Sequence, residues 1–251
     1  MSQPAKDTLI YAHRGANREA AENTRTAFER ALAYPIDGME TDVQLSRDGV
    51  AVLWHDWYLG KLGLSAKRID DFTLDELRKM DFAAHFGKDI KPEGVMSLPE
   101  FVSAFRQRCR LLLEIKSRDD EHAARQEVKI IQTLALAGDA RNGEVLVSSF
   151  HLGSLLLAHQ RAPDFPLVYN CEADQTVADA EQLLSAHPFL HGLCLHKKTL
   201  EPAMVDMLRL RKKSIAVYTC NSDAEIRRAL DLGVDILISD LPQKALQMRD
   251  A

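Results

Sequence analysis

Cysteine is scarce in this sequence: the 251 residues include four, and aromatic residues make up 6%. So few cysteines do not indicate a disulfide framework, and the lack of a Cys-x-x-Cys pair gives no sign of a zinc site. No segment approaches the roughly 18 consecutive apolar residues that a membrane-spanning helix needs. The 32 Lys and Arg nearly balance 37 Asp and Glu, so nucleic acid is not expected as the main partner. What remains is an ordinary globular composition, 46% hydrophobic, which disfavours wholesale disorder.

The second half of the chain alternates short apolar runs with helical patterns. Strands are expected at 111–114, 144–148, 167–170, 192–195, 215–219 and 235–238. Helices are expected at 122–137, 152–160, 177–186, 202–210 and 224–232. Strands separated by helices of this length form βαβ units, so a parallel sheet is expected.

The first half adds a hairpin. A strand is expected at 9–12 and a helix at 24–33, followed by strands at 38–45 and 50–54. The link Ser46-Arg47-Asp48-Gly49 is too short for a parallel crossover, so the last two strands form an antiparallel pair. The total is nine strands, and we expect one arm of the hairpin to extend beyond the rim of an eight-stranded barrel.

These elements predict an α/β fold, a TIM-type (β/α)8 barrel in a single domain spanning residues 1–251. Residues 57–97, with one helix at 74–80, form a small insertion after the third strand. Such an insertion normally lies over the active-site mouth, where it shapes substrate access.

Polar residues end or follow four of the expected strands, where a plain barrel core would be apolar. They are His13, Arg14, Glu40, Asp42, His55, Glu114 and Lys116. Catalytic groups of β/α barrels come from the C-terminal ends of several strands, so we expect these side chains to share one site. Glu40 and Asp42 are two residues apart and face the same side of their strand. If Leu45 pairs with Val50 in the hairpin, Glu40 lies opposite His55.

The residue types indicate chemistry on an anionic substrate. Glu40, Asp42 and Glu114 would repel one another unless a cation lay between them, and hard oxygen ligands favour Mg²⁺ or Ca²⁺ over zinc. Arg14 and Lys116 suit an anionic group such as phosphate. The two histidines at strand ends are candidates for general acid and general base, because imidazole titrates near neutral pH.

These residues, with others along almost the whole chain, resemble the glycerophosphodiester phosphodiesterase family. The motifs are His13-Arg14-Gly15-Ala16, Glu22-Asn23-Thr24, Glu40-Thr41-Asp42-Val43, His55-Asp56, Glu114-Ile115-Lys116, Ser148-Ser149-Phe150, Tyr218-Thr219-Cys220-Asn221, Gly233-Val234-Asp235 and Ser239-Asp240. The N-terminus has no apolar core long enough for a signal peptide, so the sequence looks most like the cytoplasmic bacterial members.

The resemblance implies hydrolysis of glycerophosphodiesters, which are deacylated phospholipids, to glycerol 3-phosphate and an alcohol. The implied ligands of a divalent cation, Mg²⁺ or Ca²⁺, are Glu40, Asp42 and Glu114, and the implied acid–base pair is His13 and His55. Arg14 and Lys116 would contact the phosphate. Tyr218 stands where many members have Trp, and it can still line the pocket and offer its hydroxyl to the substrate. Leu59-Gly60-Lys61-Leu62-Gly63 replaces an Arg-Thr-rich segment of the family, which affects the headgroup pocket.

Other interpretations of the same residues stay open. A phospholipase-D-like activity on lysophospholipids or sphingolipids needs an apolar groove, and the insertion offers no long apolar stripe. A non-catalytic barrel that binds phosphodiesters would be expected to lack a carboxylate or histidine of the set, and all are present. We favour His55 as the acid and His13 as the base. The nucleophile is either water or the neighbouring glycerol hydroxyl, and the headgroup, the metal and the oligomeric state are undetermined.

Overall fold

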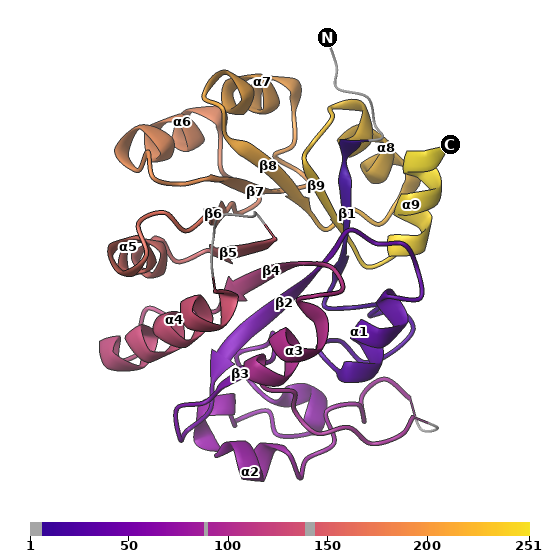
Figure 1. Ribbon diagram of the computed structural model, residues 1–251, viewed down its shortest axis with the longest axis vertical. Coiled ribbons are helices and arrows are strands. Elements are labelled where there is room, and N and C mark those ends of the chain that lie inside the picture. The colour runs from indigo at the N-terminus through magenta and orange to yellow at the C-terminus, as the bar shows by residue number, and fades with distance from the viewer. Residues whose placement is uncertain (1–6, 88–89, 139–143) are drawn as a thin grey trace.

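The fold is a closed parallel barrel, seen in a computed structural model that describes residues 7–87, 90–138 and 144–251. The strands form one sheet in the order β1-β9-β8-β7-β6-β5-β4-β2-β3, and pairing between β1 and β2 closes it (Figure 1). They are β1 (Leu9–His13), β2 (Gly38–Leu45), β3 (Ala51–Leu53), β4 (Arg110–Ile115), β5 (Val145–Ser149), β6 (Leu167–Asn170), β7 (Gly192–His196), β8 (Ser214–Tyr218) and β9 (Ile236–Ser239). β3 pairs antiparallel with β2 outside the ring. The predicted barrel and its surplus ninth strand are confirmed.

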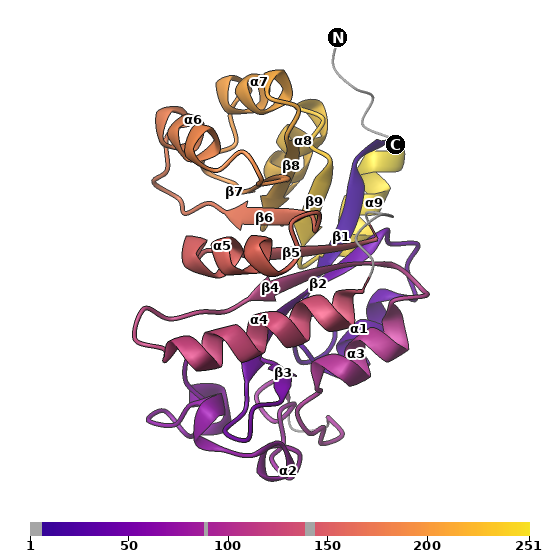
Figure 2. The same ribbon diagram turned by 60° about the vertical axis from the view of Figure 1, so that its left-hand side comes forward.

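Helices cover the outside of the barrel (Figures 1 and 2). They are α1 (Arg25–Ala31), α2 (Leu74–Leu77), α3 (Leu98–Phe105), α4 (Ala123–Ala137), α5 (Leu152–Arg161), α6 (Val177–Ala186), α7 (Pro202–Leu210), α8 (Asp223–Asp231) and α9 (Pro242–Asp250). The side chains of Thr24, Thr73, Ser97, Thr176 and Ser222 each accept a hydrogen bond from a backbone N–H of the first turn. These caps explain why the helices begin where they do.

Side chains inside the barrel form an apolar layer below a polar one. The apolar layer consists of Tyr11, Leu112, Leu146, Val168, Cys194, Ala216, Ile236 and Ile238. Because alternate residues of a strand face opposite sides, His13 and Glu114 face inward two residues beyond members of that layer. The parallel registers pair His13 with Glu40 and Asp42 with Glu114. A larger apolar core fills the space between the sheet and the helices.

The hairpin differs from the predicted register by one residue. Leu45 pairs with Ala51, not with Val50, so the prediction that Glu40 lies opposite His55 is wrong. The loop has three residues, because the N–H of Ser46 donates to Val50 O at 2.9 Å. Its last residue, Gly49, has a φ of +80°, which glycine adopts without strain. His55 lies beyond the end of β3 and reaches the barrel mouth from the following loop.

The described part of the insertion, residues 57–87 and 90–97, packs beside β3 around an apolar cluster that it shares with Val52 and Trp54. The cluster consists of Val52, Trp54, Leu59, Ile69, Leu77, Phe82 and Val95. This segment contains two short 3-10 helices, η2 (Gly60–Leu62) and η3 (Ile69–Asp71), besides α2. The helix predicted at 74–80 ends at Leu77, where turns follow.

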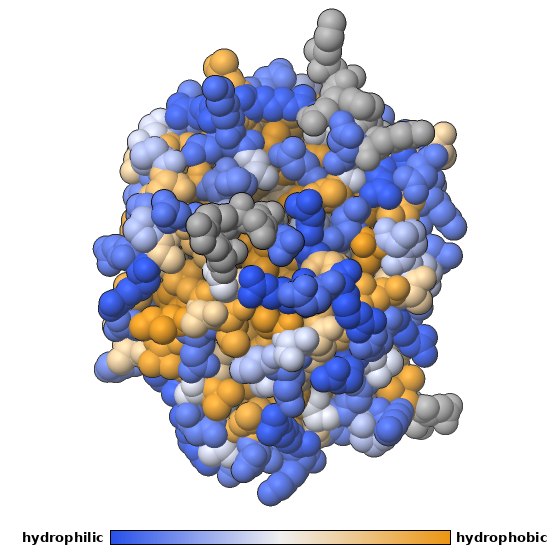
Figure 3. All heavy atoms as spheres, viewed as in Figure 1, coloured by the Kyte–Doolittle hydropathy of each residue, from blue (hydrophilic) through white to orange (hydrophobic). Residues whose placement is uncertain are grey.

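The surface is mixed in character. On the face drawn in Figure 3, apolar residues gather over α4, where Val128 and Ile131 are among the exposed large hydrophobic side chains. In the parts of the chain that the structure describes, no helix has the length and apolar character to cross a membrane.

Candidate active site

The C-terminal ends of the strands surround a small cavity of about 70 Å³. Six of the eight predicted site residues line it: His13, Arg14, Glu40, His55, Glu114 and Tyr218. The other two, Asp42 and Lys116, contact its lining, because Asp42 Oδ2 lies 2.9 Å from Arg14 Nε and Lys116 Nζ lies 2.8 Å from Glu114 Oε1. The structure therefore brings all eight predicted side chains to one place.

Three carboxylates converge at this cavity. Glu40, Asp42 and Glu114 each offer an oxygen within 4.8 Å of the others'. Glu40 and Asp42 are 4% and 0% exposed. Glu40 Oε2 and Asp42 Oδ1 accept no hydrogen bond from any residue in the described ranges. Buried carboxylate oxygens without donors fit a hard divalent cation, so the donor set agrees with the predicted Mg²⁺ or Ca²⁺.

The remaining oxygens of two of these carboxylates are held by amides. Asn23 Nδ2 donates to Asp42 Oδ2 at 3.0 Å, and Asn170 Nδ2 donates to Glu114 Oε2 at 3.2 Å. Asn23 belongs to the Glu-Asn-Thr motif noted in the sequence, but no role was predicted for it. Asn170 ends β6 and was missed, since nothing in its local sequence marks it.

Protonation of the first two carboxylates is driven in opposite directions. Burial raises the pKa of Glu40 well above its ordinary value, and the charge of Asp42 raises it further. Burial acts in the same direction on Asp42, but the charges of Arg14 and Lys116 outweigh it and hold the pKa of Asp42 well below its ordinary value. Asp42 therefore keeps its negative charge to a lower pH than Glu40 does.

Arg14 is built into the site by an unusual backbone conformation. Its φ is +58°, in the left-handed region that a residue with a side chain seldom adopts. Its N–H donates to Glu40 O at 3.0 Å, and its carbonyl accepts from the N–H of Asn23 at 3.1 Å. Its Nε lies 2.9 Å from Asp42 Oδ2. Strain of this kind persists where surrounding contacts over-determine it, which marks Arg14 as functionally constrained.

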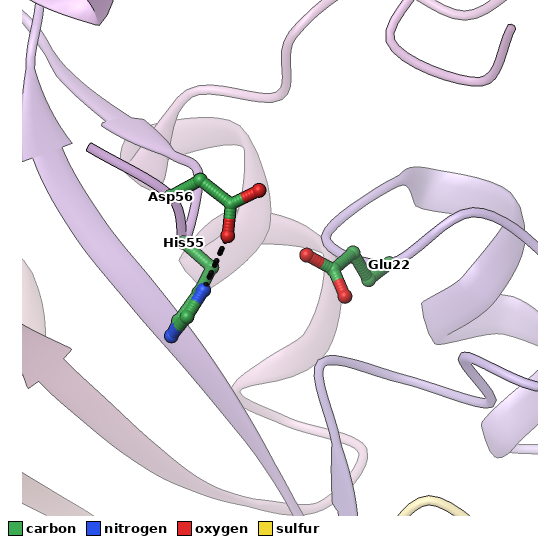
Figure 4. Close-up of side chains that lie close together, drawn as sticks. All are labelled: Glu22, His55 and Asp56. Carbon is green, nitrogen blue, oxygen red and sulfur yellow. Dashed lines mark hydrogen bonds and ion pairs between the residues drawn. The ribbon is translucent and has the colours of Figure 1, made fainter. Parts of the chain in front are cut away.

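Each histidine of the cavity is held by a carboxylate at Nδ1. His13 Nδ1 lies 2.6 Å from Asp240 Oδ1, just beyond β9, and His13 Nε2 lies 3.8 Å from Glu40 Oε2. His55 Nδ1 lies 2.7 Å from Asp56 Oδ1, and Figure 4 shows this pair beside Glu22. Sequence reasoning recorded Asp56 and Asp240 within motifs but assigned them no role. A carboxylate at Nδ1 fixes the ring and leaves Nε2 to exchange a proton.

Tyr218 lines the cavity wall. Its hydroxyl donates to Cys171 O at 2.7 Å, so a substrate meets only the acceptor side of that oxygen. Its ring meets that of Phe150 edge-on at 5.8 Å between centroids. Burial raises the pKa of Tyr218, so the hydroxyl stays protonated at neutral pH.

A second, wider cavity of about 770 Å³ adjoins the first. His55 and Phe150 line both cavities and so mark their junction. Trp57 and Tyr58, from the start of the insertion, line the wide cavity together with Lys116. The insertion therefore borders the mouth where substrate would enter.

Comparison with known proteins gives the family. A sequence model of the "Glycerophosphoryl diester phosphodiesterase family" matches residues 13–244. The chain belongs to this family. The predicted relationship and the predicted enzyme class, a phosphoric diester hydrolase of the glycerophosphodiester phosphodiesterase type, are both confirmed.

Relatives of the family match nearly the whole chain. A glycerophosphodiester phosphodiesterase of Bacillus altitudinis is 29% identical over 256 residues, covering 97% of this chain and 98% of the relative. A phosphodiesterase of Oleispira antarctica, solved in complex with its product sn-glycerol-3-phosphate, is 27% identical with a TM-score of 0.86 and coverage of 99% and 100%. A putative phosphodiesterase of Silicibacter pomeroyi, 23% identical with a TM-score of 0.84 over 97% of this chain and 93% of that one, shares the fold.

Proposed function

We propose that this protein hydrolyses glycerophosphodiesters to glycerol 3-phosphate and an alcohol, using a divalent cation and two histidines. The observation that carries the proposal is one small cavity lined by His13 and His55, each with a carboxylate at Nδ1, beside three carboxylates that direct oxygens to a common point. A bound cation would draw charge from the phosphate oxygens as the transition state forms. Glu40, Asp42 and Glu114 would hold it.

The small cavity is the proposed place of the glycerol phosphate half. The relative from Oleispira antarctica was solved in complex with its product sn-glycerol-3-phosphate, which supports glycerol 3-phosphate as a product of this chain. Arg14 lines the same cavity, and Lys116 stands at its edge. Both side chains are largely buried, at 13% and 9% exposed, so their positive charges act on a phosphate with little screening by water.

The alcohol half of the substrate would occupy the wide cavity. This division of the substrate between the two cavities indicates which histidine acts as acid and which as base. His55 lies at the junction, so its Nε2 would donate a proton to the departing alcohol. His13 lines the small cavity, so it would take a proton from the nucleophile on the glycerol side. That nucleophile is either water or the neighbouring glycerol hydroxyl.

The insertion is proposed to act on the alcohol half. Trp57 and Tyr58 offer aromatic surface, while Asp119 and Glu172 bring carboxylates to the same cavity. We propose that residues 57–97 belong to one domain with the rest of the chain and shape access to the mouth. The cytoplasmic location remains a prediction.

A coupled assay for glycerol 3-phosphate tests the proposal. Glycerophosphocholine, glycerophosphoethanolamine and lysophosphatidylcholine are each supplied with Mg²⁺, with Ca²⁺ or with chelator. We expect turnover of the first two with metal and none with chelator. Full activity in chelator would refute the cation. Cleavage of lysophosphatidylcholine by a D-type enzyme yields lysophosphatidic acid and choline, so choline release is measured in parallel. Choline from lysophosphatidylcholine alone would favour a lysophospholipase of the D type. Tight binding without turnover would indicate a non-catalytic barrel.

A further inference from the structure

A lysine of the insertion bridges two of the carboxylates drawn in Figure 4, although its own side chain is not drawn there. Glu22, from the loop after β1, and Asp56, from the loop after β3, face one another there. Lys61 Nζ lies 2.8 Å from Glu22 Oε1 and 3.0 Å from Asp56 Oδ2. The other oxygen of Asp56 holds His55 Nδ1 at 2.7 Å. One ammonium group therefore links two mouth loops to a histidine of the proposed acid–base pair.

The same series of ion pairs continues to Asp42, one of the three carboxylates proposed to hold the cation. Arg14 Nη1 lies 3.3 Å from Glu22 Oε2, and Arg14 Nε lies 2.9 Å from Asp42 Oδ2. Charges of alternating sign thus run without a gap from Asp42 through Arg14, Glu22 and Lys61 to Asp56. Networks of this kind couple more strongly than isolated pairs, because each group fixes the position of the next.

Lys61 is itself held in place. It lies on η2, and its ammonium group sits 5.6 Å from the ring centroid of Trp54, which is 1% exposed. The side chain of Lys61 is 32% exposed, so it is neither a free surface lysine nor a core residue. The ring of Trp54 and the two carboxylates together define one position for Nζ.

An ion is the alternative occupant of this place. Glu22, His55 and Asp56 offer ligand atoms within 4.8 Å of one another, a spacing that a metal could use. Lys61 Nζ, however, stands between the two carboxylates at hydrogen-bonding distance from both. The ammonium group already supplies the positive charge that this pair of carboxylates requires.

We propose that Lys61 is a positioning residue, which holds Asp56 and through it the ring of His55, and which occupies the place of a second cation. The proposal rests on the proposed function for its catalytic consequence. It also assigns a use to the segment in which this chain departs from the Arg-Thr-rich pattern of the family. Without the ammonium group, Glu22 and Asp56 repel one another and the carboxylate of Asp56 turns from His55.

Three variants test the proposal. Lys61→Met keeps an unbranched side chain that is one atom shorter and removes its charge, and Lys61→Arg restores the charge. Lys67→Met is the matched control, because Lys67 is an exposed lysine of the same insertion whose contacts in the structure are backbone hydrogen bonds. We expect Lys61→Met to lower kcat about 10- to 100-fold, the usual loss when a group that orients a side chain of the site is removed, with a smaller change in KM. Lys61→Arg should recover most of kcat, and Lys67→Met should match the wild type.

A purely structural role gives a different pattern. In that case Lys61→Met lowers the melting temperature but leaves kcat unchanged at temperatures where the variant is folded, and the proposal is overturned. Failure of Lys61→Arg to recover any activity while it folds normally would equally contradict a role for the charge.

Two readouts do not depend on activity, so they separate this proposal from failure of the proposed function. In ¹⁵N spectra of the histidine rings, with His55 assigned by His55→Ala, the His55 signals should shift in Lys61→Met and return in Lys61→Arg. Unmoved His55 signals in Lys61→Met would refute the positioning role. A crystal of the wild type soaked in Mn²⁺ should show no ion between Glu22 and Asp56, and an anomalous peak there would overturn the proposal.

Discussion

Replacing Asp240 by Asn removes the negative charge that faces His13 Nδ1, and it leaves the volume of the side chain almost unchanged. Asp240 Oδ1 faces His13 Nδ1 at 2.6 Å and Asn17 Nδ2 at 2.7 Å. Asp240 Oδ2 faces Arg18 Nη2 at 3.0 Å and Asn221 Nδ2 at 2.8 Å. All four neighbours are donors when His13 carries its proton on Nδ1, so an amide NH₂ at position 240 meets donors in either orientation.

The expected loss of kcat depends on the step at which the charge of Asp240 acts. His13 becomes positively charged as it takes a proton from the nucleophile, and the charge of Asp240 stabilises that state. A hydrogen bond to a charged group contributes about 1.5 to 3 kcal/mol. At about 1.4 kcal/mol for each tenfold change in rate, Asp240→Asn should lower kcat by about 10- to 150-fold.

The assay is production of glycerol 3-phosphate from glycerophosphocholine at saturating metal, with kcat and KM measured separately. Asp231→Asn is the control, because Asp231 is an exposed carboxylate at the C-terminal end of α8, on the outer ring of helices. Thermal melting shows whether Asp240→Asn is folded at the assay temperature. A folded Asp240→Asn protein with the kcat of the wild type would refute the role assigned to this pair.

Three further outcomes are expected. Glu40→Gln should raise the concentration of Mg²⁺ needed for half-maximal activity more than it lowers kcat at saturation; an unchanged metal requirement would speak against Glu40 as a ligand. Gly38→Ala should lower the free energy of unfolding in urea by about 1 to 3 kcal/mol, the usual cost of overpacking, because a Cβ there would lie 2.5 Å from the ring of Tyr11; no loss would mean that the ring can move. Hydrogen bonds from Lys197 and from the backbone N–H groups of Ser222 and Asn221, just before α8, lower the pKa of Glu225 to about 2, below its unfolded value. Its charge therefore stabilises the fold above pH 4.5 and ceases to do so as pH falls toward 2. Glu225→Gln should therefore be less stable than the wild type at pH 7 and approach it at pH 3, whereas a difference independent of pH would contradict this cause.

The alternation of a β-strand made the inner layer of the site predictable. Glu40 and Asp42 had to share a face, and polar residues at the ends of apolar strands had to meet where parallel strands end. The structure places His13, Glu40, Asp42 and Glu114 together in that way. These inferences succeeded because they depend on spacing within one strand and on the common direction of all strands.

The hairpin register was not predictable by the same means. The choice between Val50 and Ala51 as the partner of Leu45 depends on whether the loop has four residues or three. That choice is made by the hydrogen bond from Ser46 to Val50 and by the positive φ of Gly49. The wrong register still led to the right neighbourhood for His55, because the loop after β3 bends back toward the barrel mouth.

By itself the sequence determined the barrel, the inward faces of the first strands and the kinds of group at the mouth, since local periodicity and residue chemistry suffice for these. The tertiary structure alone decided which groups touch. Asp240 meets His13 across 227 positions of the chain, and Lys61 joins Glu22 from 39 positions away. Such contacts arise only when loops from separate strands close over one mouth, where distance and burial, not spacing along the chain, select the partner.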